Sequence, residues 1–423
     1  MRAALSAADA GACLARGLPD LRRAITAARR WHLVAAGKAA WPMADACLAS
    51  APSRPARGMV VAPAGRAGDT GGLEGFAGGH PVPTAASLAA GHRALELAAG
   101  TSDDDVLVVL LSGGASALLE APADGVTLAD LQAATTQLLR AGADIAALNA
   151  VRKHLSRVKG GRLAEAAGGA VIALAISDVV GDDPAVIASG PTVADPSTFA
   201  DALDVIARFG GARAYPRAVV DALEQGRDGL RPESPKAGSA ALARTITRVV
   251  GAGLDAIGGA RRQAEARGYR VHVHATPVTG EARVAAADLG ARIGAHASAG
   301  GMKTCLLSGG ETTVTVTGTG TGGRNQELAL ALAPALASLP REAVVASVGT
   351  DGIDGPTSAA GALVDTTTAA RARAAGLGDP APYLTDNNSF AYFTALGDLV
   401  VTGPTGTNVG DIQVAVIAGD DHP

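Results

Sequence analysis

Runs of apolar residues recur along the chain between stretches with helical periodicity. The runs at 106–111 and 170–176 are wholly apolar, and the run at 31–36 is apolar apart from His32, which is typical of strands buried on both faces of a parallel sheet. Residues 39–48 and 85–99 are predicted helices between these runs. Strands that alternate with helices in this way favour an α/β fold.

A polar stretch rich in proline, glycine and serine, residues 228–240, interrupts the pattern and is predicted to be a linker. A chain of 423 residues is long for a single core, so we predict two domains, 1–235 and 236–423. The second half again carries predicted strands, at 245–250, 269–274, 343–348 and 412–417.

Residues 305–332 carry the most informative pattern. We predict a strand, a Ser-Gly-Gly turn, a second strand in which Val314 and Val316 alternate with threonines, a glycine loop, and a helix that begins at Arg324. Glycines such as Gly322 and Gly323 let the backbone approach an anion closely, and a guanidinium at a helix start suits phosphate or carboxylate. A structural glycine turn with a surface arginine explains this stretch equally well.

Polar residues also follow the other predicted strands. Lys38 comes after the strand at 31–36, and Ser112-Gly113-Gly114-Ala115-Ser116 closes the strand at 106–111. Asp178 follows the strand at 170–176, where open α/β sheets bind ligands, and is a candidate Mg²⁺ ligand or general base. Each feature also has a plainer interpretation. Lys38 can be an ordinary exposed lysine, residues 112–116 an ordinary turn, and Asp178 a helix cap.

Three further patterns bear on the site. Asp351 and Asp354 lie in a glycine-rich turn that suits a hard cation, although turn formation alone explains them equally well. The sequence LLSGG occurs at 110–114 and 306–310, which predicts two similar strand-to-turn corners. The basic run at 149–162 is predicted to be a solvated helix face.

Composition excludes several classes of protein. The net charge of −4 provides no basic field for nucleic acid, and no run of about 18 apolar residues exists to span a membrane. The N-terminus lacks the apolar core of a signal peptide. Cys13, Cys47 and Cys305 form no CxxC pair, which favours a reducing cytoplasm.

Two glycine patterns resemble a dinucleotide fingerprint, at 318–323 and 251–256. The first follows an alternating strand and the second lacks an acidic residue about 20 positions later, so both are weak matches. They support an alternative function, an NAD(P)H-dependent reductase. A third alternative is a binding protein without catalytic activity.

Taken together, the motifs resemble one family, the class II glycerate 2-kinases, whose C-terminal part is called the MOFRL domain. The likeness runs from about Lys38 to Ile417 in the right order. It is carried by AAGKAAWPMA, GHPVPT, LLSGGASALLEAP, LNAVRKHLSRVKGGRLAE, ISDVVGDDPAVIASGPTVADPSTF, LLSGGETTVTVTGTGTGGRNQELALALA, GTDGIDGPTSAAGALVD and GPTGTNVGDIQVAV.

The resemblance implies a larger Rossmann-like N-terminal domain, a smaller α/β domain containing the MOFRL region at about 303–418, and an active site in the cleft between them. It implies transfer of phosphate from ATP to the 2-hydroxyl of D-glycerate, with a divalent cation such as Mg²⁺. Members are often named hydroxypyruvate reductases. The oligomeric state stays open, with a homodimer as one option.

The resemblance also implies roles for individual residues. Lys38 and Arg324 bind the transferring phosphate and the glycerate carboxylate, in an order left open, and Asn325 assists in substrate binding. Asp178 activates the hydroxyl or holds the metal, with Asp351 and Asp354 as second-choice ligands. The backbone of residues 112–116, with Gly322 and Gly323, cradles phosphates.

Overall fold

The computed structural model describes residues 1–63, 68–69 and 72–420, which form two compact units. One unit comprises residues 13–250, and the other comprises residues 1–12 and 251–423. The predicted boundary between 235 and 236 therefore lies upstream of the point where the chain changes unit.

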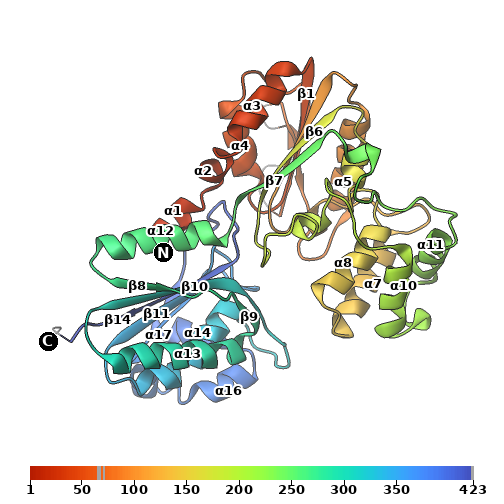
Figure 1. Ribbon diagram of the computed structural model, residues 1–423. Helices are drawn as coiled ribbons and strands as arrows, with labels where there is room; N and C mark the ends of the chain where they lie inside the picture. The colour runs from red at the N-terminus through yellow and green to blue at the C-terminus, as the bar shows by residue number, and fades with distance from the viewer. Residues whose placement is uncertain (64–67, 70–71, 421–423) are drawn as a thin grey trace. The chain divides into compact units, whose positions relative to one another are not determined.

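The unit of residues 13–250 is built on a sheet whose described strands follow the order β3-β4-β2-β1-β5-β6-β7 (Figure 1). The strands are β1 (Arg30–Ala36), β2 (Arg57–Ala62), β3 (Gly68–Asp69), β4 (Glu74–Ala77), β5 (Asp105–Leu111), β6 (Ala170–Ile176) and β7 (Thr245–Gly251). β1 pairs in parallel with β2 and β5, and β5 pairs in parallel with β6, so the predicted α/β fold with a parallel sheet is confirmed.

Alternate residues of these strands face opposite helical layers. Val34, Met59 and Val109 pack with Ala90 and Ala94 of α5 (Ala85–Ala99) in one buried cluster. In Figure 1, α3 (Leu18–Ala27) and α4 (Ala40–Ser50) lie on the other side of the sheet. Burial on both faces explains why the strand sequences are apolar without alternation.

A separate group of helices completes this unit around its own core, which includes Leu131, Leu148, Phe199 and Val219. The helices are α7 (Leu128–Arg140), α8 (Ile145–His154), α10 (Phe199–Arg208) and α11 (Arg217–Arg227). Shorter helices of the unit are α6 (Ala115–Leu118), α9 (Arg162–Glu165), η1 (Ile187–Ser189), η2 (Ala212–Ala214) and η3 (Ala240–Leu242), and α2 (Ala10–Leu14) spans the point where the chain first changes unit.

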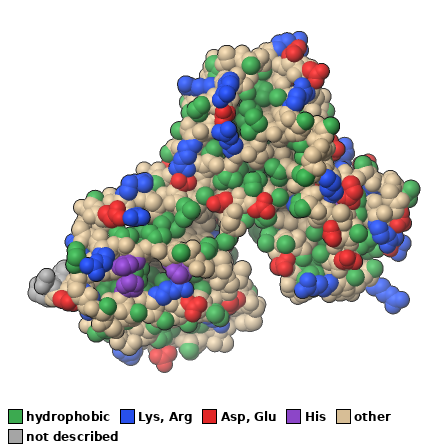
Figure 2. All heavy atoms as spheres, viewed as in Figure 1, with side chains coloured by type: hydrophobic (Ala, Val, Ile, Leu, Met, Phe, Trp, Pro, Cys, Tyr) green, Lys and Arg blue, Asp and Glu red, His purple; other side chains and the backbone are tan. Residues whose placement is uncertain are grey.

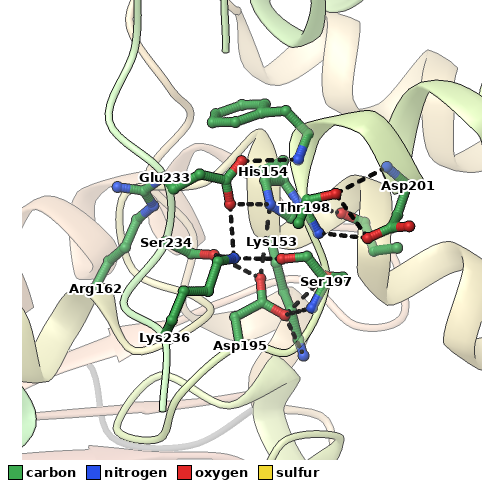
Figure 3. Close-up of polar contacts among 12 residues, drawn as sticks. Lys153, His154, Arg162, Asp195, Ser197, Thr198, Asp201, Glu233, Ser234 and Lys236 are labelled. Carbon is green, nitrogen blue, oxygen red and sulfur yellow. Dashed lines mark hydrogen bonds and ion pairs between the residues drawn. The ribbon is translucent and has the colours of Figure 1, made fainter. Parts of the chain in front are cut away.

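The prediction of a solvated face for residues 149–162 is wrong. Lys153, His154 and Lys159 are only 5%, 2% and 1% exposed. Each faces a carboxylate that comes from a distant segment, as Figure 3 shows for the first two, so the basic side chains are paired inside the unit. Distant partners of this kind leave no local signal in the sequence.

The other unit contains a mixed sheet in the order β13-β12-β11-β14-β10-β8, with β9 beside β10 (Figure 1). The strands are β8 (Arg270–Val273), β9 (Val278–Glu281), β10 (Thr304–Thr313), β11 (Ala343–Gly349), β12 (Gly361–Asp365), β13 (Leu399–Val400) and β14 (Asp411–Ile417). Helices are α1 (Arg2–Ala7), α12 (Gly253–Ala266), α13 (Ala282–Ala299), α14 (Arg324–Ala337), α15 (Thr368–Ala374), α16 (Pro380–Thr385) and α17 (Ser389–Leu396).

The predicted Ser-Gly-Gly turn in this unit is wrong. Residues 308–310 lie inside β10, where Ser308 is opposite Gln413 and Gly310 is opposite Asp411. A Cβ on Gly310 would lie 2.1 Å from the carbonyl oxygen of Val278, so glycine here permits the close approach of β9. Residues 314–317 are not a strand. The two LLSGG sequences therefore do not form equivalent corners.

Candidate functional site

In the unit of residues 13–250, two loops meet at the carboxyl edge of the parallel sheet. The backbone N–H of Lys38 donates to the carbonyl oxygen of Gly113 at 2.9 Å, and that of Ala39 donates to Ser112 Oγ at 2.9 Å. Gly37 has φ +127°, and a Cβ there would lie 2.2 Å from Ser112 Oγ. Only glycine fits this junction, which holds Lys38, half-buried, against the predicted phosphate loop.

A hydroxyl chain extends from this loop into the unit. Ser116 Oγ lies 2.8 Å from Ser189 Oγ, and the Ser189 hydroxyl donates to Asn149 Oδ1 at 3.0 Å. Ser189 and the preceding Ala188 have φ of +59° and +55°, a left-handed conformation that costs free energy in non-glycine residues. Strain of this kind often marks a functional site.

The side-chain amide of Asn149, at the end of this hydroxyl chain, has an N–H donor without an acceptor. The residue is 4% exposed, and its Nδ2 makes no hydrogen bond within the described part of the chain. A buried amide N–H₂ without an acceptor is unfavourable unless a ligand satisfies it. Arg152 lies one turn later on α8, where residues i and i+3 share a face.

The Arg152 side chain is desolvated. Burial lowers its pKa, and the charge of Glu120 partly offsets that effect. Asn149 and Arg152 belong to the basic run that the sequence analysis assigned to solvent, so both were missed as candidate site residues. The sequence LNAVRKH places Asn149 and Arg152 three positions apart, on one face of a helix, and this spacing could have marked them as site residues. The surrounding basic residues instead suggested a solvated face.

Asp178 lies two residues after the end of β6 and is half-buried. Because β6 pairs in parallel with β5, its carboxyl end lies at the same sheet edge as the end of β5. Within the described residues, no group of three or more His, Cys, Asp or Glu side chains is arranged to hold a metal. A metal bound through Asp178 would therefore need ligands from a substrate or water.

In the other unit, Arg324 forms a two-pronged ion pair with a buried carboxylate. Arg324 Nε and Nη2 donate to the two oxygens of Asp411 at 2.6 and 2.9 Å, and Arg324 Nη1 lies 3.2 Å from Glu311 Oε1. The Arg324 side chain is 33% exposed. Burial disfavours the charge, but Asp411 and then Glu311 outweigh it and raise the pKa of Arg324. Asp411 fixes the orientation of the guanidinium.

Asp354 caps the helix that Arg324 begins. Its two oxygens accept the backbone N–H groups of Asn325 and Gln326 at 3.0 and 2.9 Å. Burial raises the pKa of Asp354 to about 6. The Asn325 side chain donates to Asp411 at 2.9 Å and accepts the Ser347 hydroxyl at 2.7 Å. Asp354 is thus engaged in capping, and Asn325 supports the Arg324–Asp411 pair.

Asp351 lies three residues before this cap. Its Oδ1 accepts the backbone N–H of Ile353 at 3.0 Å, an interaction typical of a turn. The metal-binding roles of Asp351 and Asp354 stay predictions.

The glycine loop before α14 is anchored to the segment before α17. Backbone N–H groups of Gly318 and Thr319 donate to the side chains of Asn387 and Asp386 at 2.9 and 2.8 Å. A Cβ on Gly322 would lie 2.2 Å from Ser389 Oγ, and one on Gly323 would lie 2.3 Å from Asp354 Cγ. These glycines allow close packing of the loop, and their role in phosphate binding stays a prediction.

Lys38 and Arg324 belong to different units. Their convergence on one reacting centre, in a cleft between two domains, stays a prediction.

Two family models match the chain. A model described as a domain of unknown function, DUF4147, matches residues 1–224, and the MOFRL family model matches residues 304–411. Together they span most of both units.

Named relatives cover most of the chain. A D-glycerate 2-kinase of Thermotoga maritima is 40% identical and covers 91% of this chain and 90% of its own length. A glycerate 2-kinase of Pyrococcus horikoshii is 37% identical over 80% of this chain and 77% of its own. A protein of Agrobacterium vitis that carries a provisional hydroxypyruvate reductase name is 41% identical and covers 98% of this chain and 92% of its own length.

A solved structure agrees with these relatives. The crystal structure of glycerate kinase from Thermotoga maritima superimposes with a TM-score of 0.83 at 38% identity, covering 98% of this chain and 97% of that one. The predicted resemblance is confirmed, and the chain belongs to the family of MOFRL-containing glycerate 2-kinases.

Proposed function

We propose that this protein transfers the γ-phosphoryl group of ATP to the 2-hydroxyl of D-glycerate, which gives 2-phosphoglycerate and ADP. The observation that carries this proposal is the 40% identity to a D-glycerate 2-kinase over nine-tenths of both chains. In the reaction, a bond forms between O2 and the phosphorus while the bond from the phosphorus to the ADP oxygen breaks.

Lys38 and Arg324 are the cations of the proposed site. One binds the transferring phosphate and the other the glycerate carboxylate. Phosphoryl transfer depends on positioning and charge neutralisation, which a lysine held at a strand end and an arginine held by Asp411 can provide. Asp411 is a positioning residue in this scheme, because it acts through Arg324.

Asp178 accepts the proton of the 2-hydroxyl as the O2–phosphorus bond forms. A divalent cation such as Mg²⁺, when bound, would neutralise charge on the phosphates. Asp178 would hold this cation in place of the proton-accepting role, with Asp351 and Asp354 as second-choice ligands.

Asn149 and Arg152 extend the binding surface in the unit of residues 13–250. A buried amide donor without an acceptor and a desolvated arginine suit an anionic oxygen of substrate or nucleotide. The hydrogen bond from Ser189 fixes the Asn149 amide so that Nδ2 remains available.

The test is a coupled assay that measures ADP release with ATP, Mg²⁺ and D-glycerate. Lys38→Ala and Arg324→Ala should each lower kcat/KM by roughly 10²–10⁴-fold, the range for losing one charged group at a phosphoryl centre. Lys303→Ala, which changes an exposed lysine, is the control and should keep wild-type activity. Near-normal activity in Lys38→Ala would remove that residue from the site.

The reductase name of one relative makes a second function testable. Oxidation of NADH with hydroxypyruvate in the absence of ATP would favour the reductase. Binding of ATP and glycerate without turnover under varied divalent metals would favour a binding protein.

We also propose a cytoplasmic location. Cys47 and Cys305 are buried thiols that form no disulfide within the described residues, as expected for a reducing compartment. Among the described residues, no helix has the length and apolarity that a membrane crossing requires.

A further inference from the structure

A pocket of about 280 Å³ lies on the unit of residues 251–423, at the edge strand β8. It is separate from Arg324 and from the glycine loop. Figure 2 shows histidine and basic side chains gathered around a hollow on this face. The lining residues are His272, Val273, His274, Leu289, Arg292, Ala295, His296, Leu306, Leu307 and Ser308.

The polar lining is basic and contains no carboxylate. His272 and His274 come from β8 and its end, Arg292 and His296 come from one face of α13, and β10 contributes only Leu306, Leu307 and Ser308. Within the described part of the chain, none of these four basic side chains makes a hydrogen bond or an ion pair. The rings of His272 and His296 pack against each other with centroids 4.5 Å apart.

The basic groups of this pocket lack the carboxylate partners that other buried or half-buried arginines of the described chain have, as in the Arg324–Asp411 and Arg283–Glu327 pairs. Protonation of these histidines beside Arg292 without a counter-charge is electrostatically unfavourable, and a bound anion would reverse that effect.

We propose that this pocket binds a small phosphorylated anion, with the phosphate on Arg292 and the three histidines and a short apolar body against the leucines. The volume suits a compact ligand, because typical small-molecule pockets begin at about 300 Å³. The ligand is bound outside the residues assigned to phosphoryl transfer, so the pocket is a second anion site.

A metal ion is a poorer occupant. Two or three histidines suit a transition metal, but Arg292 would repel a cation, and the lining offers no carboxylate to balance one. An anion, in contrast, can accept hydrogen bonds from Arg292 and from the three histidines at the same time.

Binding should be linked to proton uptake. Burial, and then the charge of Arg292, lower the pKa of His274, while burial and then His272 lower that of His296. A bound phosphate favours the protonated form of both rings and raises these pKa values. Affinity should therefore rise as the pH falls from about 8 to 6.

The experiment follows the histidine ring signals by NMR in the full-length protein during titration with inorganic phosphate and with phenyl phosphate. Signals of His272, His274 and His296, assigned with His→Gln variants, should shift together, and phenyl phosphate should bind more tightly because its ring contacts the leucines. Arg292→Leu should weaken binding by roughly tenfold or more, which corresponds to about 1.4 kcal/mol.

Two controls separate this site from the proposed active site. Lys38→Ala should leave the histidine shifts intact, and Arg373→Leu, which changes an exposed arginine on α15, should bind like the wild type. Arg292→Leu should keep wild-type kinase activity in an assay without added phosphate or phenyl phosphate. Absence of shifts, shifts that survive in Arg292→Leu, or shifts produced by Zn²⁺ but not by phosphate would each overturn the proposal.

Discussion

Glu120 and Lys159 form an ion pair inside the unit of residues 13–250. Their charged atoms are 2.5 Å apart, and the side chains are 6% and 1% exposed. Burial lowers the pKa of Lys159, and Glu120 opposes that change. Lys159→Met should lower the free energy of unfolding by about 3–5 kcal/mol, because Glu120 is left as an unpaired buried charge. Urea denaturation measures the loss.

The double variant Glu120→Gln/Lys159→Met tests the cause. With both charges gone, stability should return most of the way to the wild-type value. If the double variant is less stable than Lys159→Met alone, loss of packing rather than an unpaired charge explains the effect.

Asp105 gives the fold a defined acid sensitivity. It is 2% exposed and accepts hydrogen bonds from Arg30 Nη2 at 3.0 Å and from Ser102 Oγ at 2.8 Å. The Arg30 guanidinium holds the pKa of Asp105 below its usual range, although burial opposes this. A carboxyl group with a lowered folded pKa contributes stability above its unfolded pKa and loses it as the pH falls.

Asp105→Asn should therefore be less stable than the wild type at pH 7, by roughly 1–3 kcal/mol. The difference should shrink as the pH falls below about 4, because the carboxyl then becomes protonated in the unfolded chain while the folded protein still holds it ionised. Urea midpoints at pH 7, 5 and 3 measure this. A difference that stays constant down to pH 3 would show that the carboxylate charge is not the cause.

At the scale of residues, the sequence predicted those site residues that lie in a recognisable local motif. Lys38 and the serines of residues 112–116 follow apolar strands, so their place at the sheet edge could be predicted. Asn149 and the pairing of Arg324 with Asp411 could not, because the partners are 40 and 87 positions apart in the chain. Such contacts depend on tertiary packing.

Among the elements, α12 shows how one glycine fixes a helix contact. A Cβ on Gly259 would lie 2.3 Å from the carbonyl oxygen of Ala3 and 2.5 Å from the Cβ of Ala7. Gly259→Ala should push α1 away and destabilise the unit of residues 251–423, by roughly 1–3 kcal/mol. Thermal denaturation measures the change.

The neighbouring Gly258 provides a matched control. It lies in the same helix, and a Cβ there would meet only the end of Arg262 at 3.5 Å. Gly258→Ala should raise the unfolding free energy by up to about 1 kcal/mol through helix propensity. Equal effects of the two substitutions would argue against close packing of α1 on α12.

Periodicity predicted most elements well, since α5 and β6 begin and end where the pattern placed them. The prediction was wrong at β10, because Gly309 and Gly310 suggested a turn inside what is a continuous strand. Their actual role is to admit β9 and β14 alongside the strand. A glycine that serves close approach and a glycine that serves a turn look alike in sequence.

At the scale of the whole molecule, the α/β class and the parallel sheet were predictable because fully buried strands differ from alternating ones. The mixed order of the second sheet was not, since β14 inserts between β10 and β11 from the end of the chain. Nor did any pattern predict that residues 1–12 belong with residues 251–423.

The central claim is that Lys38 and Arg324, from different units, act on one reacting centre. The most direct test is a double-mutant cycle on kcat/KM for D-glycerate, with Lys38→Ala, Arg324→Ala and the double variant, and with Lys38→Ala/Lys303→Ala as the reference pair. We expect the double variant to be scarcely slower than the slower single variant, because either loss already disables the shared centre. Losses that multiply independently, or a single variant with wild-type kcat/KM, would contradict the account.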